Sequence, residues 1–300
     1  MRLEMLKVYR SPGEGGKLTL MKKGRLIESG RVIEGVLKGS GNEFRIKEGI
    51  PDFTWPKKLS RIDEKTRKDY DLLADEYHKF ASIPFETYYS DESKIRERMV
   101  DQLNIKPGGL ALEIGCGDGR SSEHIVKRLG KKGKLCLQEL SPAFLKKAVK
   151  RLEKYHRNVE FSVANGCYLS FPDKLFDAAH HFGGLNTFSD IKRCLSELAR
   201  VVKTGGKVVV GDESMAPWLR DCQFGRIMMN SNPLLKCGIP LADIPLCARD
   251  VKLEWIMMGA FYVIEFTVGE AEPVGNYHIP IPSNRGGTHW SRYYGYDKKI

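Results

Sequence analysis

Glycine and acidic residues cluster in one short stretch whose spacing is suited to binding a small charged molecule. The run LEIGCGDG, residues 112–119, is apolar at its start and then brings Gly115, Gly117 and Gly119. Glycines at the end of a strand allow a tight turn and a close approach to a ligand, and the helix that follows offers free N–H groups. Glu113 lies just ahead of the turn, where it could pair with a positively charged aminoacyl group. The glycine spacing departs from the G-x-G-x-x-G of dinucleotide sites, which favours a different cofactor.

Polar residues also close the next two predicted strands. Glu139 ends LCLQEL, 20 residues beyond Gly119, where an acidic side chain can accept hydrogen bonds from both hydroxyls of a ribose. Asn165 and Gly166 follow the third strand, where a side-chain amide could read the edge of an adenine ring. An asparagine in a loop is as often a simple turn residue.

Candidates for proton transfer stand at the ends of the fourth and fifth predicted strands. His180 and His181 lie at the end of FDAAHHF, and alternation of side chains along a strand predicts that at most one of them faces the pocket. A packed histidine without a catalytic role is the more common outcome. Asp212 and Glu213 follow KVVVG and belong to the same edge of the sheet.

The elements that must position these residues begin at residue 110. Five apolar strands are predicted, in LALEIGCG, KLCLQEL, VEFSVAN, FDAAHHF and KVVVGDE. Helices are predicted between them, in SSEHIVKRLG, in PAFLKKAVKRLEKYH and over 190–202. This alternation predicts an α/β fold with a parallel sheet and helices on both faces. VKLEWIM and FYVIEFTVG, on either side of Met258-Gly259-Ala260, predict an antiparallel hairpin.

The chain before residue 106 is predicted to form two smaller parts. Residues 1–58 contain short alternating runs broken by glycines, which predict a small β-rich module. Residues 59–105 are predicted to be a helical cap or linker, with one amphipathic helix over 62–81 and a second over 91–103. The apolar face of the first helix would consist of Leu72, Leu73, Tyr77 and Phe80.

The cofactor-binding domain is predicted to cover residues 106–270. It would carry an insert near 215–250 that contains a helical stretch at 217–235. Residues 271–300 are aromatic and basic, and we expect a tail or a lid over the substrate. The residues that could form such a lid are His289, Trp290, Arg292, Tyr293 and Tyr294.

Composition narrows the class of protein. The chain has 300 residues, 41% hydrophobic and 29% charged, and no apolar run approaches the roughly 20 residues that span a bilayer. Its N-terminus is charged throughout and lacks the apolar part of a signal peptide. Seven scattered cysteines, never spaced C-x-x-C, argue against a disulfide framework and a zinc site. We therefore expect a cytoplasmic protein with no membrane span and no metal.

The net charge of +11 is unevenly distributed. Residues 1–70 contain 17 Lys and Arg against 10 Asp and Glu, which is +7. A basic module can attract phosphates or an acidic partner, so nucleic acid is one candidate partner. A solvated basic face is the more common explanation of such a charge.

The central motifs together resemble a known family. The run from LEIGCGDGR through LQELSPAFLKKA, FSVANGCYLSFPDKLFDAAHHF and ELARVVKTGGKVVVGDE is similar to the class I S-adenosylmethionine (SAM)-dependent methyltransferases. It resembles the branch of ubiquinone, menaquinone and natural-product methyltransferases, and DYDLLADEYHKF resembles that branch's N-terminal helix. The resemblance covers residues 110–214. It implies a Rossmann-like seven-stranded sheet, parallel with an antiparallel C-terminal hairpin strand, and SAM as cofactor with S-adenosylhomocysteine as product.

The resemblance implies which residues surround the reactive part of SAM. The residues around its methionine part would be Glu113, Gly115, Gly117 and Gly119. His181 and Phe182 would line the pocket beside the sulfonium, and Tyr77 would close over the cofactor. His181 and His180 are the candidate catalytic residues.

The resemblance also implies the adenosine contacts. Glu139 and Leu140 would hold the ribose and flank the adenine, while Asn165 and Gly166 would meet the adenine ring. The family usually has aspartate at position 165, but an asparagine can still accept from the adenine amino group through its carbonyl oxygen. Asn186-Thr187 stands where many relatives carry paired histidines, which removes one common candidate for a base.

The N-terminal module has a resemblance of its own. SPGEGGKLTL and IEGVLKGSGNEFRIKEGIPDF are similar to the zinc ribbon that precedes some methyltransferases, which is also the fold of a small activator subunit of RNA methyltransferases. The cysteine pairs of the ribbon are absent, because Ser11, Glu14 and Ser40 stand in their places. These residues do not make a tetrahedral zinc site, so hydrophobic packing would have to replace the metal.

Methyl transfer from SAM is an in-line displacement, for which the protein chiefly aligns the reactants. A general base is needed only when the acceptor must lose a proton. The sequence predicts a methyltransferase that acts on O, N or C of a small molecule. One alternative is an rRNA or tRNA methyltransferase, although no Asn-Pro-Pro-Tyr or Asp-Pro-Pro-Tyr signature follows the fourth strand. Another is a non-catalytic partner protein with a SAM-binding fold.

Overall fold

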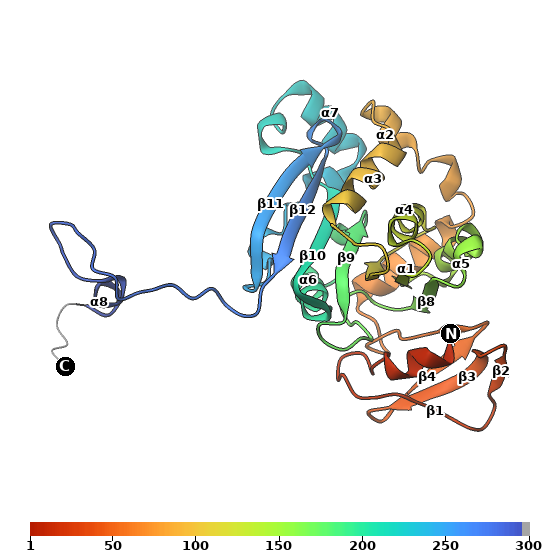
Figure 1. Cartoon of the computed structure of the whole chain (residues 1–300). Helices are drawn as coiled ribbons and strands as arrows, with labels where there is room; N and C mark the ends of the chain where they lie inside the picture. Colours follow the sequence, from red (N-terminus) through yellow and green to blue (C-terminus); the bar gives the residue numbers. More distant parts are fainter. Residues whose placement is uncertain (296–300) are drawn as a thin grey trace.

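A seven-stranded sheet forms the centre of the protein (Figure 1), and the computed structural model describes residues 1–295. The strand order is β11-β12-β10-β9-β6-β7-β8. The bounds are β6 (Leu110–Ile114), β7 (Lys134–Glu139), β8 (Val159–Val163), β9 (Phe176–Phe182), β10 (Val202–Glu213), β11 (Ala248–Ile256) and β12 (Phe261–Val268). Strands β6 to β10 run parallel, whereas β12 pairs antiparallel with both β10 and β11. The predicted Rossmann-like fold with its C-terminal hairpin is confirmed.

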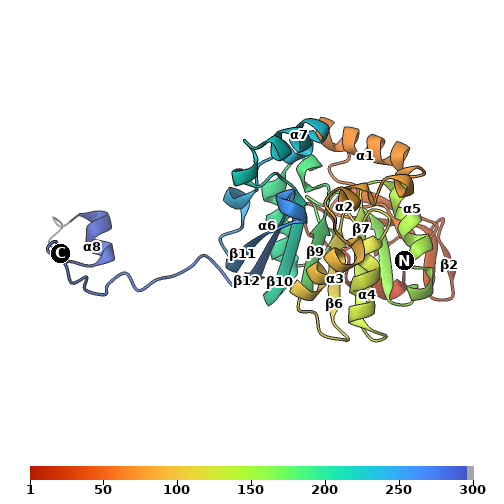
Figure 2. The ribbon, with the colours of Figure 1, turned by 90° about the horizontal axis from the view of Figure 1, so that it is seen from above.

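Helices cover both faces of this sheet, as Figure 2 shows from above. The long helices are α3 (Glu92–Gln102), α4 (Arg120–Leu129), α5 (Pro142–Arg151) and α6 (Ile191–Val201), with short turns at η3 (Glu153–Tyr155) and η4 (Leu185–Thr187). Helices α3, α4 and α5 share one core with Ala111, whereas α6 shares the other with Leu112. Neighbouring residues of β6 thus enter opposite cores, which is the alternation expected of a strand buried on both faces.

The N-terminal residues form a separate small sheet that packs on the edge of the large one. Its elements are η1 (Leu3–Lys7), β1 (Thr19–Leu20), β2 (Leu26–Glu28), β3 (Arg31–Gly39), β4 (Asn42–Lys47) and β5 (Ile50–Pro51). The backbone N–H of Phe53 donates to the carbonyl of Val163 at 2.7 Å, which continues the large sheet beyond β8. The ring of Tyr9 lies 4.8 Å from Phe53 and 5.5 Å from Phe171. The two sheets therefore share an apolar core.

The segment after the small sheet crosses the top of the large sheet as α1 (Arg61–Leu73), η2 (Tyr77–Lys79) and α2 (Ile83–Thr87). Ser60 caps α1 by accepting from the N–H of Asp63 at 3.0 Å. The predicted single helix over 62–81 is wrong, because α1 ends at Leu73. The predicted apolar face is wrong for Leu72 and Leu73, which are exposed, whereas Tyr77 and Phe80 line the cavity described below. On α1 itself the polar residues Asp63 and Thr66 face the protein.

The insert between β10 and β11 consists of short helices and not of one helical stretch. They are η5 (Pro217–Leu219), α7 (Gln223–Ser231), η6 (Pro233–Lys236) and η7 (Leu241–Asp243), and η8 (Met257–Gly259) turns the hairpin. Pro233 begins η6 directly after the end of α7, since a proline has no N–H to continue the earlier helix. No helix among residues 1–295 is long and apolar enough to cross a membrane.

The C-terminal segment leaves the body of the protein after β12. Figure 1 shows it running away from both sheets to α8 (His289–Tyr294), which Thr288 caps. The ring of Trp290 packs on His278 and Tyr294 of the same segment. The predicted lid is therefore wrong for the tail up to residue 295, because its aromatic residues pack on one another and not over the sheet. The rest of the predicted tail lies outside the described residues.

Candidate active site

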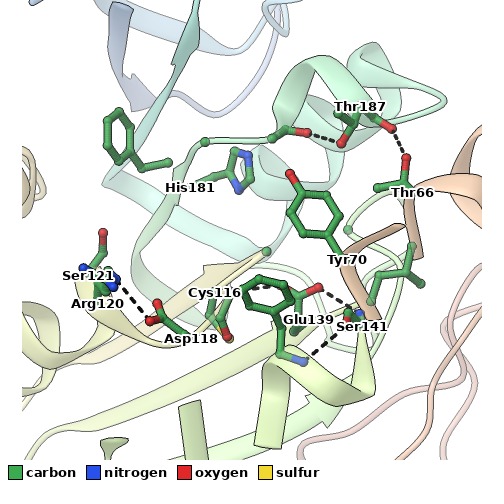
Figure 3. Close-up of a pocket in the computed structure, with 18 of the residues that line it drawn as sticks. Thr66, Tyr70, Cys116, Asp118, Arg120, Ser121, Glu139, Ser141, His181 and Thr187 are labelled. Carbon is green, nitrogen blue, oxygen red and sulfur yellow. Dashed lines mark hydrogen bonds and ion pairs between the residues drawn. The ribbon is translucent and has the colours of Figure 1, made fainter. Parts of the chain in front are cut away.

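A cavity lies where the parallel strands end at their carboxyl edge, and residues of α1 and α2 line it. This edge is where parallel α/β sheets bind ligands, beside the strand at which the order reverses, here β6. Figure 3 shows Tyr70, His181 and Glu139 around the same space. The predicted site residues that line the cavity are Tyr77, Glu113, Gly115, Gly117, Glu139, Leu140, Asn165, Gly166, His181 and Phe182.

The glycine loop between β6 and α4 has a conformation that only glycine adopts readily. Gly115 and Gly117 both have φ of +55°, and both line the cavity. Gly119, with φ of +84°, has a different role from the predicted one. A Cβ atom there would lie 3.3 Å from Cα and Cβ of Ala148, so Gly119 allows α4 and α5 to pack closely. Gly119 is not among the residues that line the cavity, so the structure does not bring it together with Gly115 and Gly117 there.

Glu139 is fixed by the backbone around it. Its Oε2 accepts from the N–H of Gly117 and its Oε1 from the N–H of Ser141, both at 2.9 Å. Burial raises the pKa of Glu139, and these N–H groups act against that rise by favouring the carboxylate. Each carboxylate oxygen can accept a second hydrogen bond, so the side chain is still able to bind two hydroxyl groups.

Asn165 is fixed by a residue that sequence reasoning missed. Its side-chain amide donates to Oδ2 of Asp63 at 3.2 Å, and its carbonyl oxygen accepts from the N–H of Cys167 at 3.0 Å. Asp63 also accepts from the N–H of Ser189 at 3.1 Å and from its hydroxyl at 2.6 Å. Asp63 thereby ties α1 to the loops after β8 and η4. Asp63, Thr66 and Tyr70 all line the cavity. Their spacing of three and four residues places them on one face of a helix, and this spacing is the feature of the sequence that could have identified them.

His181 faces the cavity and His180 does not, as strand alternation requires. Nδ1 of His181 lies 2.9 Å from the carbonyl oxygen of Ile114, which can only accept, so Nδ1 carries the proton. Burial lowers the pKa of His181, and the ring is neutral near pH 7. Its buried Nε2 has no hydrogen-bond partner within residues 1–295 and keeps its lone pair. His181 therefore has the chemistry of a general base.

His180 lies in the core beside Glu113. It is fully buried, with Nδ1 3.3 Å from Oε1 of Glu113, and it is outside the cavity lining. The structure thus does not bring His180 to the cavity with the other predicted site residues, and a catalytic role for it has no support from this position. Glu113 itself lines the cavity and accepts a hydrogen bond from the hydroxyl of Ser122. Glu113 is the carboxylate of β6, and it lies two residues before the first glycine of the loop that follows this strand.

Aromatic rings line much of the cavity. Tyr77 packs edge-on against Phe144, with ring centroids 4.9 Å apart, and burial raises the pKa of Tyr77. Phe182 lies 6.0 Å from Phe261. The guanidinium of Arg96, a second residue that sequence reasoning missed, stands 5.3 Å from the Phe182 ring. These rings provide flat apolar walls, and the cation adds one charged group among them.

The groups present fit SAM. A carboxylate on β6 suits its ammonium group, the glycine loop admits a close backbone approach, and a carboxylate at the end of β7 suits the ribose hydroxyls. Asn165 offers one carbonyl lone pair beyond its bond to Cys167 for an adenine amino group. The unpartnered nitrogen of His181 lies in the wall beside the glycine loop.

Comparisons with known proteins agree with this site. Residues 111–206 match the model of a family described as a methyltransferase domain. The ubiquinone/menaquinone biosynthesis C-methyltransferase UbiE of Hydrogenovibrio crunogenus is 28% identical over 38% of this chain and 46% of its own length. The demethylmenaquinone methyltransferase of Bacillus licheniformis is 27% identical over 49% and 63%. The 2-phytyl-1,4-naphtoquinone methyltransferase of a Nostoc species is 32% identical over 39% and 52%. The chain thus spans about half the length of the curated relatives that it matches.

Solved structures share the fold at low identity. One belongs to the complex between the Haloferax volcanii Trm112 methyltransferase activator and a methyltransferase, with a TM-score of 0.52, 12% identity, and coverage of 69% of this chain and 99% of that one. Another is the [4+2]-cyclase SpnF, with a TM-score of 0.50, 14% identity, and coverage of 73% and 98%. The match over residues 111–206 and the named relatives show that this part of the chain is a methyltransferase domain of the class I SAM-dependent kind.

Proposed function

We propose that the protein transfers the methyl group of SAM to a small-molecule acceptor by in-line displacement. The observation that supports this most strongly is the shared cavity. It joins the residues suited to SAM with the unpartnered Nε2 of His181. Bound SAM would supply the electrophilic methyl group, and the protein would supply alignment, which can be worth on the order of 7–11 kcal/mol.

Each part of the cavity has a proposed task. Glu113 and the backbone at Gly115 and Gly117 would hold the aminoacyl end of SAM. Glu139 would bind the ribose hydroxyls. The adenine would lie between Leu140, Asn165 and Gly166, which line the same cavity as Glu139.

His181 is proposed as the general base. Its Nε2 would accept the proton that an oxygen, nitrogen or carbon acceptor loses as the new bond to the methyl carbon forms. The hydrogen bond from Nδ1 to Ile114 fixes the orientation of the ring and leaves Nε2 as the nitrogen that can accept a proton. Tyr77, on the segment that crosses the top of the sheet, would exclude water from the reacting groups.

The helix that covers the cavity supports a small acceptor. Thr66 donates to the carbonyl of Thr187 at 3.2 Å, and Asp63 bonds to Ser189, so α1 is fastened across the opening. Relatives named as quinone and naphthoquinone methyltransferases support a small flat acceptor. An RNA acceptor, suggested by the basic residues 1–70, is the alternative.

One experiment distinguishes the acceptor classes. The protein is incubated with methyl-labelled SAM and a cell extract of its host, which is then separated into small molecules, RNA and protein. We expect label in the small-molecule fraction, and loss of that label with His181→Phe. Label in RNA would favour the alternative, and no transferred label in any fraction together with SAM binding would favour a non-catalytic partner protein.

A further inference from the structure

Two consecutive acidic residues, Asp212 and Glu213, end strand β10 at the cavity, and only one of them has partners for a negative charge. Asp212 is fully buried, and its carboxylate accepts from the backbone N–H of Gly184 at 3.0 Å and of Asn186 at 2.5 Å. Hydrogen bonds from backbone N–H groups stabilise a carboxylate. Asp212 is therefore the charged member of the pair.

Glu213 lacks such support although it lines the cavity. Its Oε2 is buried and has no hydrogen-bond partner in the described part of the chain, and none of the described lysines and arginines forms an ion pair with it. Burial first, and then the Asp212 carboxylate, raise the pKa of Glu213 well above its usual range. Burial, the Asp212 charge and a hydrogen bond shared with the Asp212 side chain thus favour the protonated form of Glu213, while its Oε2 is left without a partner in the described part of the chain.

Most groups around Glu213 are neutral or acidic. They include Asp212, Tyr70, Tyr88, Tyr262 and Cys237, and burial raises the pKa of the three tyrosines and of Cys237. A cation also lies on this side: the guanidinium of Arg220 donates to the hydroxyl of Ser214 at 3.4 Å and to the carbonyl of Cys237 at 3.1 Å, and it forms no ion pair with Glu213 in the described part of the chain. Burial and the Asp212 carboxylate therefore disfavour a second negative charge at Glu213.

Glu213 also has a defined place relative to the other cavity walls. It pairs with Phe261 across β10 and β12, and Phe261 lies 6.0 Å from Phe182. His181 is on β9, in register with Val210 of β10. A flat molecule packed on the two phenylalanines would thus have an acid near one side and the His181 base on the strand beside it.

We propose that Glu213 is a catalytic residue that donates a hydrogen bond from its carboxylic acid to an oxygen of the acceptor while His181 removes the acceptor's proton. The acceptor is then a flat ring that carries a hydroxyl or carbonyl oxygen. As the methyl carbon bonds to the acceptor, the C–S bond breaks and its electron pair stays on sulfur. The acceptor's proton passes to Nε2 of His181, and the negative charge that develops on the oxygen is stabilised by the Glu213 O–H. This inference rests on the proposed function.

The first test is binding of a probe ring with and without oxygens. Affinities of 1,4-dihydroxynaphthalene and naphthalene are measured by calorimetry, without oxygen and with S-adenosylhomocysteine present. We expect the dihydroxy compound to bind the wild type about tenfold more tightly, which corresponds to one hydrogen bond of about 1.4 kcal/mol. Equal affinities for the two compounds would overturn the proposal.

Two variants distinguish a protonated Glu213 that donates a hydrogen bond from an ionised Glu213 that accepts a proton. Glu213→Gln keeps a donating group, so we expect it to retain the preference for the dihydroxy compound within about threefold. Glu213→Leu should abolish the preference while naphthalene binding stays the same. If Glu213→Gln loses the preference as fully as Glu213→Leu does, Glu213 acts as a carboxylate and the proposal is wrong.

A second measurement follows the proton itself. The infrared difference spectrum between wild type and Glu213→Gln at pH 7 should contain the C=O band of a protonated carboxylic acid. The matched control is Glu270→Gln, an exposed glutamate that should give only carboxylate bands. Absence of the acid band in the first pair would overturn the proposal. Failure of the wild type to bind S-adenosylhomocysteine would instead count against the proposed function as a whole.

Discussion

Gly115 and His181 occupy complementary space: a Cβ atom on Gly115 would lie 2.9 Å from Cε1 and 3.0 Å from Nδ1 of the His181 ring. The first glycine of the loop therefore does more than permit a turn with positive φ. It leaves room for the histidine whose Nδ1 bonds to Ile114 in the strand before that loop. The cofactor loop and the proposed base are thus parts of one packed unit.

Gly115→Ala should therefore disturb both the loop and the base. We expect a loss of about 1 kcal/mol in the free energy of unfolding from the positive φ, and a loss of at least about tenfold in affinity for S-adenosylhomocysteine. Gly130→Ala is the control, because Gly130 has φ of +66° and its Cβ would meet no described atom within 4 Å. Calorimetry and chemical unfolding would check both variants. Equal ligand affinity in the two would contradict the relationship between Gly115 and His181.

Removal of the Asp63 carboxylate should loosen α1 over the cavity. Asp63→Ala leaves the Asn165 amide and both Ser189 donors without their acceptor, which is expected to cost about 1–3 kcal/mol of stability. S-adenosylhomocysteine should bind about tenfold more weakly, since Asn165 loses its fixed orientation. Asp69→Ala on the same helix is the control, because Asp69 is exposed and, among residues 1–295, forms an ion pair with Lys65 alone. Binding that is as tight in the Asp63 variant as in the Asp69 variant would refute this role.

The protonation of Glu213 predicts how stability depends on pH. In the unfolded chain a glutamate loses its proton above about pH 4.3, whereas the folded chain holds the proton at Glu213 to a higher pH. The folded state then binds more protons, so the stability due to this group is present below pH 4.3 and is lost as pH rises through the folded pKa. The slope is up to about 1.4 kcal/mol per pH unit. Urea unfolding at several pH values should show a smaller loss in Glu213→Gln, and the same loss in both proteins would refute the assignment.

His181 makes the stability of the protein depend on pH in the opposite direction to Glu213. Its folded pKa is lowered, so the unfolded chain binds more protons below pH 6.5, and the stability due to this group is lost as pH falls below that value. Methyl transfer should likewise fall at acid pH, because a protonated His181 accepts no proton. We expect His181→Gln to lower kcat by about 100-fold or more with little change in affinity for S-adenosylhomocysteine. A variant that keeps wild-type kcat would show that the reaction uses no base at position 181.

The two sheets are expected to unfold together. Phe53 is fully buried and contacts Tyr9 and Phe44, so Phe53→Ala should cost about 3–5 kcal/mol. Leu26→Ala in β2 is the control, since Leu26 is 45% exposed and the change should cost less than about 0.5 kcal/mol. Scanning calorimetry of Phe53→Ala should show a single transition at a lower temperature. A second transition that leaves the main one in place would mean that the small sheet unfolds by itself.

The strands and the alternation of the large sheet could be predicted from sequence because each strand is a compact apolar run with glycines or acidic residues at its end. His180 and His181 are consecutive in one strand, so the alternation of side chains predicted that at most one of them faces the cavity. It did not predict which one, because that depends on how β9 sits between β6 and β10. Gly119 shows the same limit: glycine spacing does not distinguish a contact with a ligand from close packing of α4 on α5.

The covering of the cavity was harder to predict, since it depends on contacts between residues far apart in the sequence. Leu72 fits the apolar face of a helix by spacing alone, yet it is exposed because α1 places polar residues against the sheet edge. Asp63 fixes α1 over the cavity through its hydrogen bonds with Asn165 and Ser189, which lie more than 100 residues away in the sequence. Such long-range pairs leave no local pattern in a single sequence.

Binding of SAM at this cavity is the central claim, and titration calorimetry tests it most directly. We expect the wild type to bind one S-adenosylhomocysteine per chain, and Glu139→Ala to lose at least about tenfold in affinity. Glu272→Ala is the control, because Glu272 is exposed and its loss should leave the thermal midpoint unchanged. The control should bind as the wild type does. No binding by the wild type, or equal affinity in wild type and Glu139→Ala, would contradict the account.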